Sequence, residues 1–340
     1  MKRIVSLLLV FLLFLSGCSN QKKDTSRQYT ATFLSLFDTL TTVIGRAESE
    51  EAFSKKAQDV HDLLYEYHIL FDIYTSYEGV NNLKTVNDQA GIAPVKVDKR
   101  IIDLLTDVKE YYDVTGGRVN GCMGSVLSLW HEARNDGVND PVNAYLPDEN
   151  ALREADKHTD ISSLVIDREN STVFLADKDM SLDVGAIAKG WSAEKVAQAS
   201  PSGLLISVGG NVIATGPKDD KGTRWVIGIQ DPDSDKYVHT IYLSKGSVVT
   251  SGDYQRGYWV GDEYFHHIID PDTLYPSKYF RSVTVVCQDS GAADALSTAL
   301  FLLPIEEGMK LLEKYGAKAM WIDKDNKIHY SPGFESLIRT

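Results

Sequence analysis

Strand-like segments gather in the second half of the chain, and this clustering constrains the fold more than any other feature. Helix-like patterns dominate the first half, and two further helices precede a closing hairpin. Strict alternation of strands and helices builds parallel βαβ units, whereas clustered elements favour antiparallel sheets. The order therefore predicts an α+β fold. The predicted strands of this half are Leu204 to Val208, Trp225 to Gln230, Val238 to Leu243, Tyr258 to Ile269 (folded back at Gly261 and Asp262), Ser282 to Cys287, Ala319 to Ile322 and Lys327 to Tyr330.

The first half carries the longest amphipathic patterns, together with one strand and one hairpin. No internal repeat interrupts it, and no linker follows Thr30. About 310 residues can bury a large core, as one domain or as two entwined lobes. The predicted elements are a strand from Thr30 to Ile44, helices from Glu48 to Leu70, Asp98 to Tyr112, Pro147 to Lys157 and Gly185 to Ala199, and a hairpin joining Leu164–Asp167 to Thr172–Leu175.

The amino terminus predicts export and a lipid anchor. Lys2 and Arg3 precede a short apolar run, and small residues lead to Cys18 in a pattern that resembles the bacterial lipobox. Residues 1–17 are therefore predicted to be a lipoprotein signal peptide, Cys18 the lipidated residue, and residues 18–30 a polar tether. An ordinary signal peptide cleaved elsewhere is the alternative. The domain of residues 31–340 is expected outside the cytoplasm, anchored to a membrane.

Charge and cysteine usage narrow the possible partners. Removal of the two basic residues of the signal segment leaves 33 basic against 48 acidic residues, a net charge of −15. An acidic chain without a basic block argues against nucleic acid as a partner. Beyond Cys18 the chain has only Cys122 and Cys287, both in apolar surroundings. We expect two buried thiols, with a disulfide as the alternative.

A carboxylate and a hydroxyl share one face of a predicted helix. Asp294 and Thr298 are four residues apart, so their side chains project in the same direction. Oxygen ligands near a helix N-terminus, where a phosphate is also favoured, are suited to magnesium. A helix cap or a solvated face is the simpler explanation for such a pair. The polar run at residues 250–253 and the pair His266 and His267 make a reactive site the better interpretation.

Three glycine-containing passages and one aromatic segment could also contact a ligand. Residues 183–190 join a strand to a helix through small residues, and Lys189 there could meet a phosphate, although the spacing is not that of a Walker loop. Residues 207–211 contain two adjacent glycines, which a tight turn would also explain. Residues 116–121 form a third flexible passage. The aromatic segment ending at Tyr74 is core unless an aromatic ligand lies beside it.

Taken in order, these segments resemble the ApbE-type flavin transferases, the FAD:protein FMN transferases. The resemblance extends from Phe37 to the Asp294 segment, with six signatures in the same order. The matching motifs are Asp183 with Gly185, Ala186, Lys189 and Gly190; Gly209, Gly210 and Asn211; Ile229 to Pro232; Thr250 to Asp253; His267 to Pro271; and Ala293 to Ala295 before Ser297 and Thr298.

The resemblance implies a fold, a reaction and a set of site residues. The fold would be α+β, with mixed helices and antiparallel sheets and the FAD site between two entwined lobes. The reaction would cleave FAD and attach FMN to a Thr or Ser hydroxyl of an acceptor flavoprotein, releasing AMP. Implied magnesium ligands are Asp294, Thr298 and the Ala186 carbonyl; implied FAD contacts are Tyr74, Val119, Asn120, Asp183, Lys189 and Ile268; the implied catalytic residue is His267.

Three other functions remain open at this stage. A pyrophosphatase that splits FAD into FMN and AMP would use the same residues with water as the nucleophile. A flavin-binding lipoprotein would need no catalytic histidine, and a solute-binding lipoprotein would share only the anchor and the acidic surface. The set of His267, Asp294 and Thr298 favours an enzyme over either binding protein.

Overall fold

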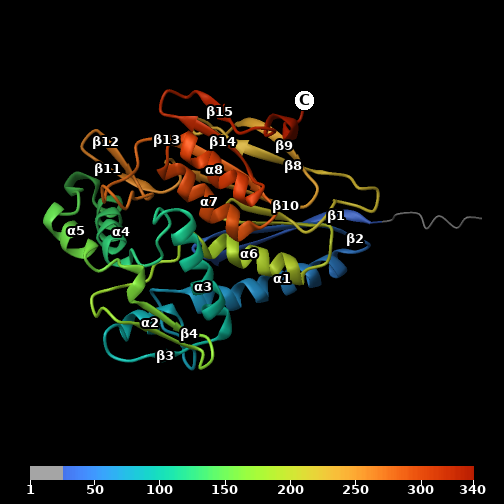
Figure 1. Cartoon of the computed structure of the whole chain (residues 1–340). Coiled ribbons are helices and arrows are strands. Elements are labelled where there is room, and N and C mark those ends of the chain that lie inside the picture. The colour runs from blue at the N-terminus through green and yellow to red at the C-terminus, as the bar shows by residue number, and fades with distance from the viewer. Residues whose placement is uncertain (1–25) are drawn as a thin grey trace, which may run out of the picture.

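A computed structural model describes residues 26–340 of the chain (Figure 1). The predicted signal segment and Cys18 lie outside the described residues, as does most of the predicted tether. Within the described part, no helix is both long enough and apolar enough to cross a membrane. The element order mixes helices with antiparallel sheets, so the predicted α+β class is confirmed.

An eight-stranded antiparallel sheet forms the centre of the molecule. Its order is β1-β2-β6-β7-β10-β13-β14-β15, so the N-terminal hairpin extends a sheet built mainly by the second half of the chain. Both halves of the sequence thus contribute strands to one sheet, with those of the first half together at one edge. The strands are β1 (Arg27–Leu36), β2 (Thr39–Ala47), β6 (Leu204–Val208), β7 (Asn211–Ala214), β10 (Gly246–Gly252), β13 (Phe280–Cys287), β14 (Lys318–Asp323) and β15 (Ile328–Tyr330).

The two faces of this sheet are covered by different partners. Helices pack on one face, where Val43, Ile213 and Val285 join the main apolar core with α1, α6 and α7. On the other face, Ala214 and Met320 pack with the β8–β9 hairpin in a smaller core. The helices are α1 (Glu50–Phe71), α2 (Leu83–Asp88), α3 (Lys99–Val114), α4 (Gly124–Asn139), α5 (Glu149–Asp156), α6 (Ala188–Ala199), α7 (Ser290–Leu302) and α8 (Ile305–Tyr315).

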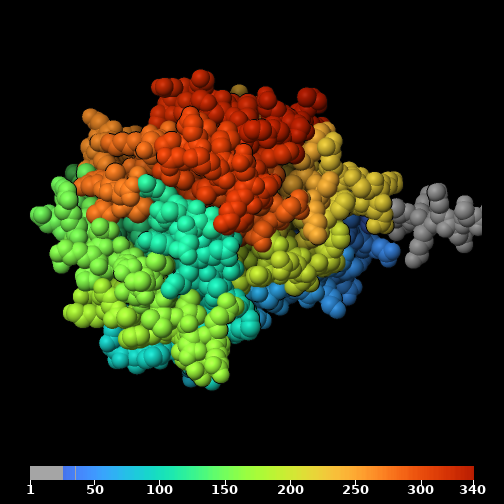
Figure 2. Space-filling view, viewed as in Figure 1, coloured from blue at the N-terminus to red at the C-terminus, as the bar shows by residue number. Residues whose placement is uncertain are grey.

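Smaller sheets stand at the periphery of the central one. The pair β11–β12 packs against α4 and α5 around Trp130 and Tyr258, and these green and orange segments meet at one end of the molecule (Figure 2). The sheet β3-β5-β4 lies with α2 and α3 at another edge (Figure 1). Their strands are β3 (Val95–Lys96), β4 (Leu164–Asp167), β5 (Thr172–Leu175), β8 (Trp225–Gln230), β9 (Tyr237–Leu243), β11 (Gly257–Val260) and β12 (Glu263–His266).

The N-terminal strand prediction is wrong in one respect. The segment from Thr30 to Ile44 forms two strands, because the chain reverses at Phe37 and Asp38, both with a φ of +52°. Consecutive left-handed residues make the tight turn that suits a twisted hairpin, and they usually include glycine or asparagine. The turn was therefore hidden by its composition. Residues 27–30, assigned to the tether, belong to β1 and pair with β2.

Other boundaries shift, and five elements were missed. Helix α6 begins at Ala188, so residues 185–187 form a turn rather than the predicted first helical residues. Strand β12 ends at His266, whereas the sequence predicted a strand up to Ile269. The missed elements are α2, β3, α4, β7 and β10. The remaining helices and the β4–β5 hairpin match their predictions, and Cys122 and Cys287 are buried free thiols as expected.

Candidate functional site

Helices α6 and α7 cross at a glycine, and the crossing places the Asp294 carboxylate. A Cβ atom on Gly190 would lie 2.3 Å from the Ser290 carbonyl oxygen and 2.4 Å from the Asp294 Cβ, so only glycine fits there. The Gly190 backbone N–H donates to Asp294 Oδ2 at 2.8 Å. Asp289 caps α7 by accepting from the Ala292 N–H at 2.8 Å. The N-terminal part of α7 therefore holds the Asp294 carboxylate against the first turn of α6.

Asp294 has the environment of a ligand rather than of a structural ion pair. Its side chain is 4% exposed, and burial raises the pKa of the carboxyl although the Lys189 charge opposes that shift. Within residues 26–340, one hydrogen bond reaches the carboxylate, the one from Gly190. A buried carboxylate with open acceptor sites is costly unless a cation or further donors complete it.

Two further oxygens can join Asp294 in holding a cation. Thr298 lies one turn further along α7 on the same helical face, and its side chain is partly exposed. The Gly190 N–H, which an extended helix would direct to the Ala186 carbonyl, goes to Asp294 instead. Among the described residues, no donor reaches the Ala186 carbonyl oxygen. A carboxylate, a hydroxyl and a carbonyl are the donor types that magnesium takes in proteins, so the predicted ligand set fits.

The turn before α6 is held rigidly by side-chain hydrogen bonds. Asp183 Oδ1 accepts from the Gly185 N–H at 2.9 Å, and Lys189 Nζ donates to the Gly185 carbonyl at 3.2 Å. Asn87 exchanges two hydrogen bonds with the Leu182 backbone, at 3.1 and 2.8 Å. Lys189 is partly exposed, and its positive charge contributes to the pKa shifts of both Asp294 and His267. The ammonium group therefore acts electrostatically on both side chains.

A cavity of about 450 Å³ opens beside this turn. Asp183 and Tyr74, two of the predicted FAD contacts, line it together with His131 of α4. The Tyr74 hydroxyl and His131 Nδ1 lie 3.0 Å apart, and His131 Nε2 lies 3.9 Å from Asp183 Oδ2. The Tyr74 side chain is 62% exposed, so its ring is available to a ligand and is not a core residue. His131 was missed because α4 itself was not predicted.

The two adjacent histidines have different environments. His266 is buried, with Nε2 2.8 Å from the Ser277 carbonyl oxygen and Nδ1 accepting from the Ile268 N–H at 3.2 Å. This pattern requires the neutral ring with the proton on Nε2. The His267 ring is only partly buried, and His267 Nδ1 lies 3.1 Å from the Arg256 carbonyl oxygen. Nε2 of His267 is therefore the nitrogen available to a substrate.

Desolvation and neighbouring cations keep His267 neutral. Desolvation, followed by the charge of Arg256, lowers the pKa of His267 to about 3, and Lys189 contributes in the same direction. A crevice lined by both histidines and by His131 runs beside α4, so His131 borders both the larger cavity and the His267 region. The imidazole is thus an unprotonated acceptor at neutral pH, close to Lys189.

The remaining predicted FAD contacts are engaged within the protein. Val119 is 2% exposed in the main core, and the segment of Val119 and Asn120 has no regular secondary structure. Asn120 Nδ2 donates to the Thr159 carbonyl at 2.9 Å, and its Oδ1 accepts from the Cys122 N–H at 2.9 Å. Ile268 is likewise buried. The Val119 N–H is also engaged, because it donates to the Thr115 hydroxyl at 3.1 Å. The assignment of these residues to an FAD site stays a prediction.

An ion pair that the sequence did not reveal ties two motif segments together. Arg118 Nη1 lies 3.2 Å from Asp270 Oδ1 and 2.5 Å from Asp272 Oδ2. Asp270 is buried, so the aspartate of the histidine motif serves to anchor residues 116–121. In the sequence, the one signal for this ion pair was the position of Arg118 within a polar, glycine-containing passage.

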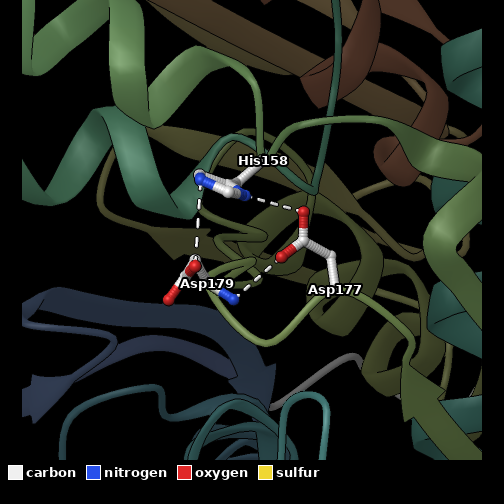
Figure 3. Close-up of side chains that lie close together, drawn as sticks. All are labelled: His158, Asp177 and Asp179. Carbon is white, nitrogen blue, oxygen red and sulfur yellow. Dashed lines mark hydrogen bonds and ion pairs between the residues drawn. The ribbon is translucent and has the colours of Figure 1, made fainter.

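A second group of possible metal ligands lies apart from this site. His158, Asp177 and Asp179 present ligand atoms within 4.8 Å of one another (Figure 3). His158 Nδ1 lies 2.7 Å from Asp177 Oδ2, and Asp177 Oδ1 accepts from the Asp179 N–H at 2.9 Å. Both oxygens of Asp177 are therefore used by the protein itself. The cluster is a partly exposed, hydrogen-bonded contact between the loop that follows α5 and the turn that follows β5.

Comparisons with known proteins agree with the motif order. The ApbE family profile matches residues 37–321. The FAD:protein FMN transferase of Treponema pallidum (strain Nichols) is 33% identical over 322 residues, 87% of each chain. That of Klebsiella pneumoniae (strain 342) is 30% identical, covering 80% of this chain and 83% of its own. The crystal structure of the ApbE protein of Thermotoga maritima MSB8 has a TM-score of 0.82 at 26% identity, covering 92% of this chain and all of its own. The chain therefore belongs to the ApbE family.

Proposed function

We propose that this chain is a magnesium-dependent FAD:protein FMN transferase, which attaches FMN to a Thr or Ser hydroxyl of an acceptor protein and releases AMP. One observation carries the proposal. The buried Asp294 carboxylate keeps open acceptor sites beside a free carbonyl, a hydroxyl and the Lys189 ammonium group. The curated relatives named above are FAD:protein FMN transferases, which supports the same activity here.

Asp294, Thr298 and the Ala186 carbonyl would hold the magnesium ion. When bound, the ion supplies positive charge that neutralises the pyrophosphate and polarises its phosphorus centres. Lys189 adds a second positive charge beside the turn before α6. Tyr74 and Asp183 line the adjoining cavity and orient the nucleotide, so that substrate positioning supplies much of the acceleration.

His267 would act on the acceptor hydroxyl. The hydroxyl oxygen attacks the phosphorus of the FMN half, a P–O bond forms there, and the bond to the AMP phosphate breaks. Neutral Nε2 of His267 takes the hydroxyl proton, and AMP leaves with the bridging oxygen. Arg256 and Lys189 keep the free imidazole unprotonated, and the anionic phosphates counteract that effect when the substrate is present.

The proposed location follows from the amino terminus. Lipidation at Cys18 would anchor the domain on the outer side of a membrane, within reach of exported acceptor proteins. Cys18→Ser is expected to move the protein from the membrane to the soluble fraction. Equal incorporation of a radiolabelled fatty acid into wild type and variant would contradict the anchor.

Mass spectrometry of acceptor proteins tests the activity directly. Candidate exported flavoproteins are incubated with the protein, FAD and magnesium, and both bound and free FMN are measured. Transfer predicts a mass increase equal to one FMN phosphoester on a Thr or Ser residue, with AMP formed in equal amount. Free FMN without any bound FMN, for every acceptor tried, would indicate a pyrophosphatase. FAD recovered intact would indicate a binding protein.

A further inference from the structure

The asparagine of the double-glycine motif lies on the same side of the sheet as the site. Gly209 and Gly210, with φ of +57° and +91°, form the tight turn between β6 and β7, and Asn211 is the first residue of β7. Side chains alternate along a strand, and Ile213 joins the core that contains α6 and α7. Asn211 therefore projects towards these helices, and β7 contacts both of them.

The Asn211 amide is buried without a partner. Its side chain is 3% exposed, and Nδ2 has no acceptor within hydrogen-bonding distance. An unpaired buried donor destabilises a fold, so it is normally kept for a group that the bound state brings into place. The Asp294 carboxylate is a suitable acceptor for this donor. Burial raises the pKa of Asp294, and the Asn211 amide is among the groups that lower it. This interaction, together with the contact between β7 and α7, places the amide beside the carboxylate.

The two observations complement one another. Asp294 is a buried carboxylate with one donor, and Asn211 is a buried donor without an acceptor. We propose that Asn211 is a positioning residue, whose Nδ2–H closes onto the Asp294 carboxylate when a cation draws that carboxylate into its binding geometry. Gly190 and Asn211 would then hold the carboxylate by two donors and leave an oxygen for the metal.

This role rests on the proposed function to the extent that Asp294 is a metal ligand. Groups that hold a ligand in place typically change metal affinity about 10- to 100-fold when they are removed. A purely structural amide would change stability instead and leave metal affinity unaltered. Metal affinity therefore separates the two roles.

Manganese binding provides the direct test, because Mn²⁺ accepts the oxygen ligands that magnesium uses. Full-length protein saturated with FAD is titrated with Mn²⁺, and free Mn²⁺ is followed by electron paramagnetic resonance. Asn211→Ala should weaken the affinity about 10- to 100-fold. Ser282→Ala is the matched control, because it also removes a fully buried, unpartnered polar group of the central sheet, in β13. The control should bind Mn²⁺ like the wild type, and equal affinity in Asn211→Ala would overturn the proposal.

A double-mutant cycle tests the contact when metal is absent. Unfolding of wild type, Asn211→Ala, Asp294→Ala and the double variant is measured with a chelator present. Coupled residues predict non-additive changes, whereas strictly additive changes would contradict the contact. If the wild type binds no Mn²⁺, the proposed metal site fails, and the cycle still decides whether Asn211 acts on Asp294. If Asn211→Ala does not fold, a crystal structure of the metal-bound wild type gives the distance from Asn211 Nδ2 to the Asp294 carboxylate instead. An amide that points away from the carboxylate would overturn the inference.

Discussion

Two regions within residues 26–340 offer possible metal ligands, and they differ in how far the protein itself satisfies those groups. At the crossing of α6 and α7, Asp294 is buried and accepts one hydrogen bond, beside an unpartnered amide and a free carbonyl. In the cluster of His158, Asp177 and Asp179, His158 and Asp177 satisfy each other near the surface. Proximity of ligand atoms is common to both regions. Burial combined with unfilled hydrogen-bonding capacity distinguishes the first.

The difference has a physical cause in desolvation. A surface carboxylate is stabilised by water and by local hydrogen bonds, so it gains little from a cation. A buried carboxylate with open acceptor sites has lost its water, and a cation then relieves a large desolvation penalty. Burial accordingly raises the pKa of Asp294, whereas the hydrogen bond from His158 leads the causes that lower the pKa of Asp177.

The largest expected effect comes from Asp294→Ala. Loss of the charged ligand should lower FMN transfer by about 10³-fold or more, since metal charge stabilises the transition state by several kcal/mol. The fold should survive, because a desolvated carboxylate is removed. Magnesium dependence of turnover and the melting temperature are measured together. Asp177→Ala is the matched change in the other region, and an equal loss of transfer there would break the comparison.

His267→Ala should reduce transfer by roughly 10²- to 10⁴-fold while FAD binding persists. The reason is that the ring acts on the acceptor proton and not on the nucleotide. Single-turnover transfer and equilibrium FAD binding measure the two properties separately. His158→Ala is the control, because it removes a histidine from the cluster of His158, Asp177 and Asp179. Unimpaired transfer by His267→Ala would remove this residue from the chemistry.

His266→Ala should act on stability more than on the transfer chemistry. The ring loses hydrogen bonds with Ser277 and Ile268 and an edge contact with Phe301, all in buried surroundings. A loss of roughly 2–4 kcal/mol in the free energy of unfolding is expected. Urea denaturation of the two histidine variants, side by side, measures it. A larger stability loss in His267→Ala than in His266→Ala would reverse the assignment of the two rings.

The smallest effect is expected at Asp177, and it should depend on pH. A carboxylate with a lowered pKa stabilises the folded state above its ordinary value of 3.8, and that contribution disappears as pH falls through the folded pKa. Asp177→Asn should therefore reduce stability at pH 7 by less than about 1 kcal/mol, and the difference should shrink as the pH falls below 3.8 and through the folded pKa. Urea unfolding between pH 3 and pH 7 tests this. A difference that grows towards acid would contradict the sign.

Local sequence patterns predicted most of the elements but few of the contacts. Helix α1 and the β4–β5 hairpin were evident because apolar spacing and turn residues determine them within a few positions. The β1–β2 turn was hidden because Phe37 and Asp38 are not typical left-handed residues. Helix α4 was missed because glycine and polar residues interrupt its apolar face.

The site shows the same division between local and long-range information. The Asp294 and Thr298 pair was visible in the sequence, because helical spacing alone aligns it. Gly190, Asn211 and His131 act on residues far away in the chain, so their roles required the packing of α6, β7 and α4. The environment of His267 also depends on Arg256 and Lys189, which no local pattern connects to it.

Anomalous diffraction from crystals grown with FAD and Mn²⁺ tests the central claim most directly, because it locates the metal in both regions at once. The account predicts a Mn²⁺ peak beside Asp294, Thr298 and the Ala186 carbonyl, and none at the cluster of His158, Asp177 and Asp179. A peak at that cluster without one at Asp294 would contradict the account.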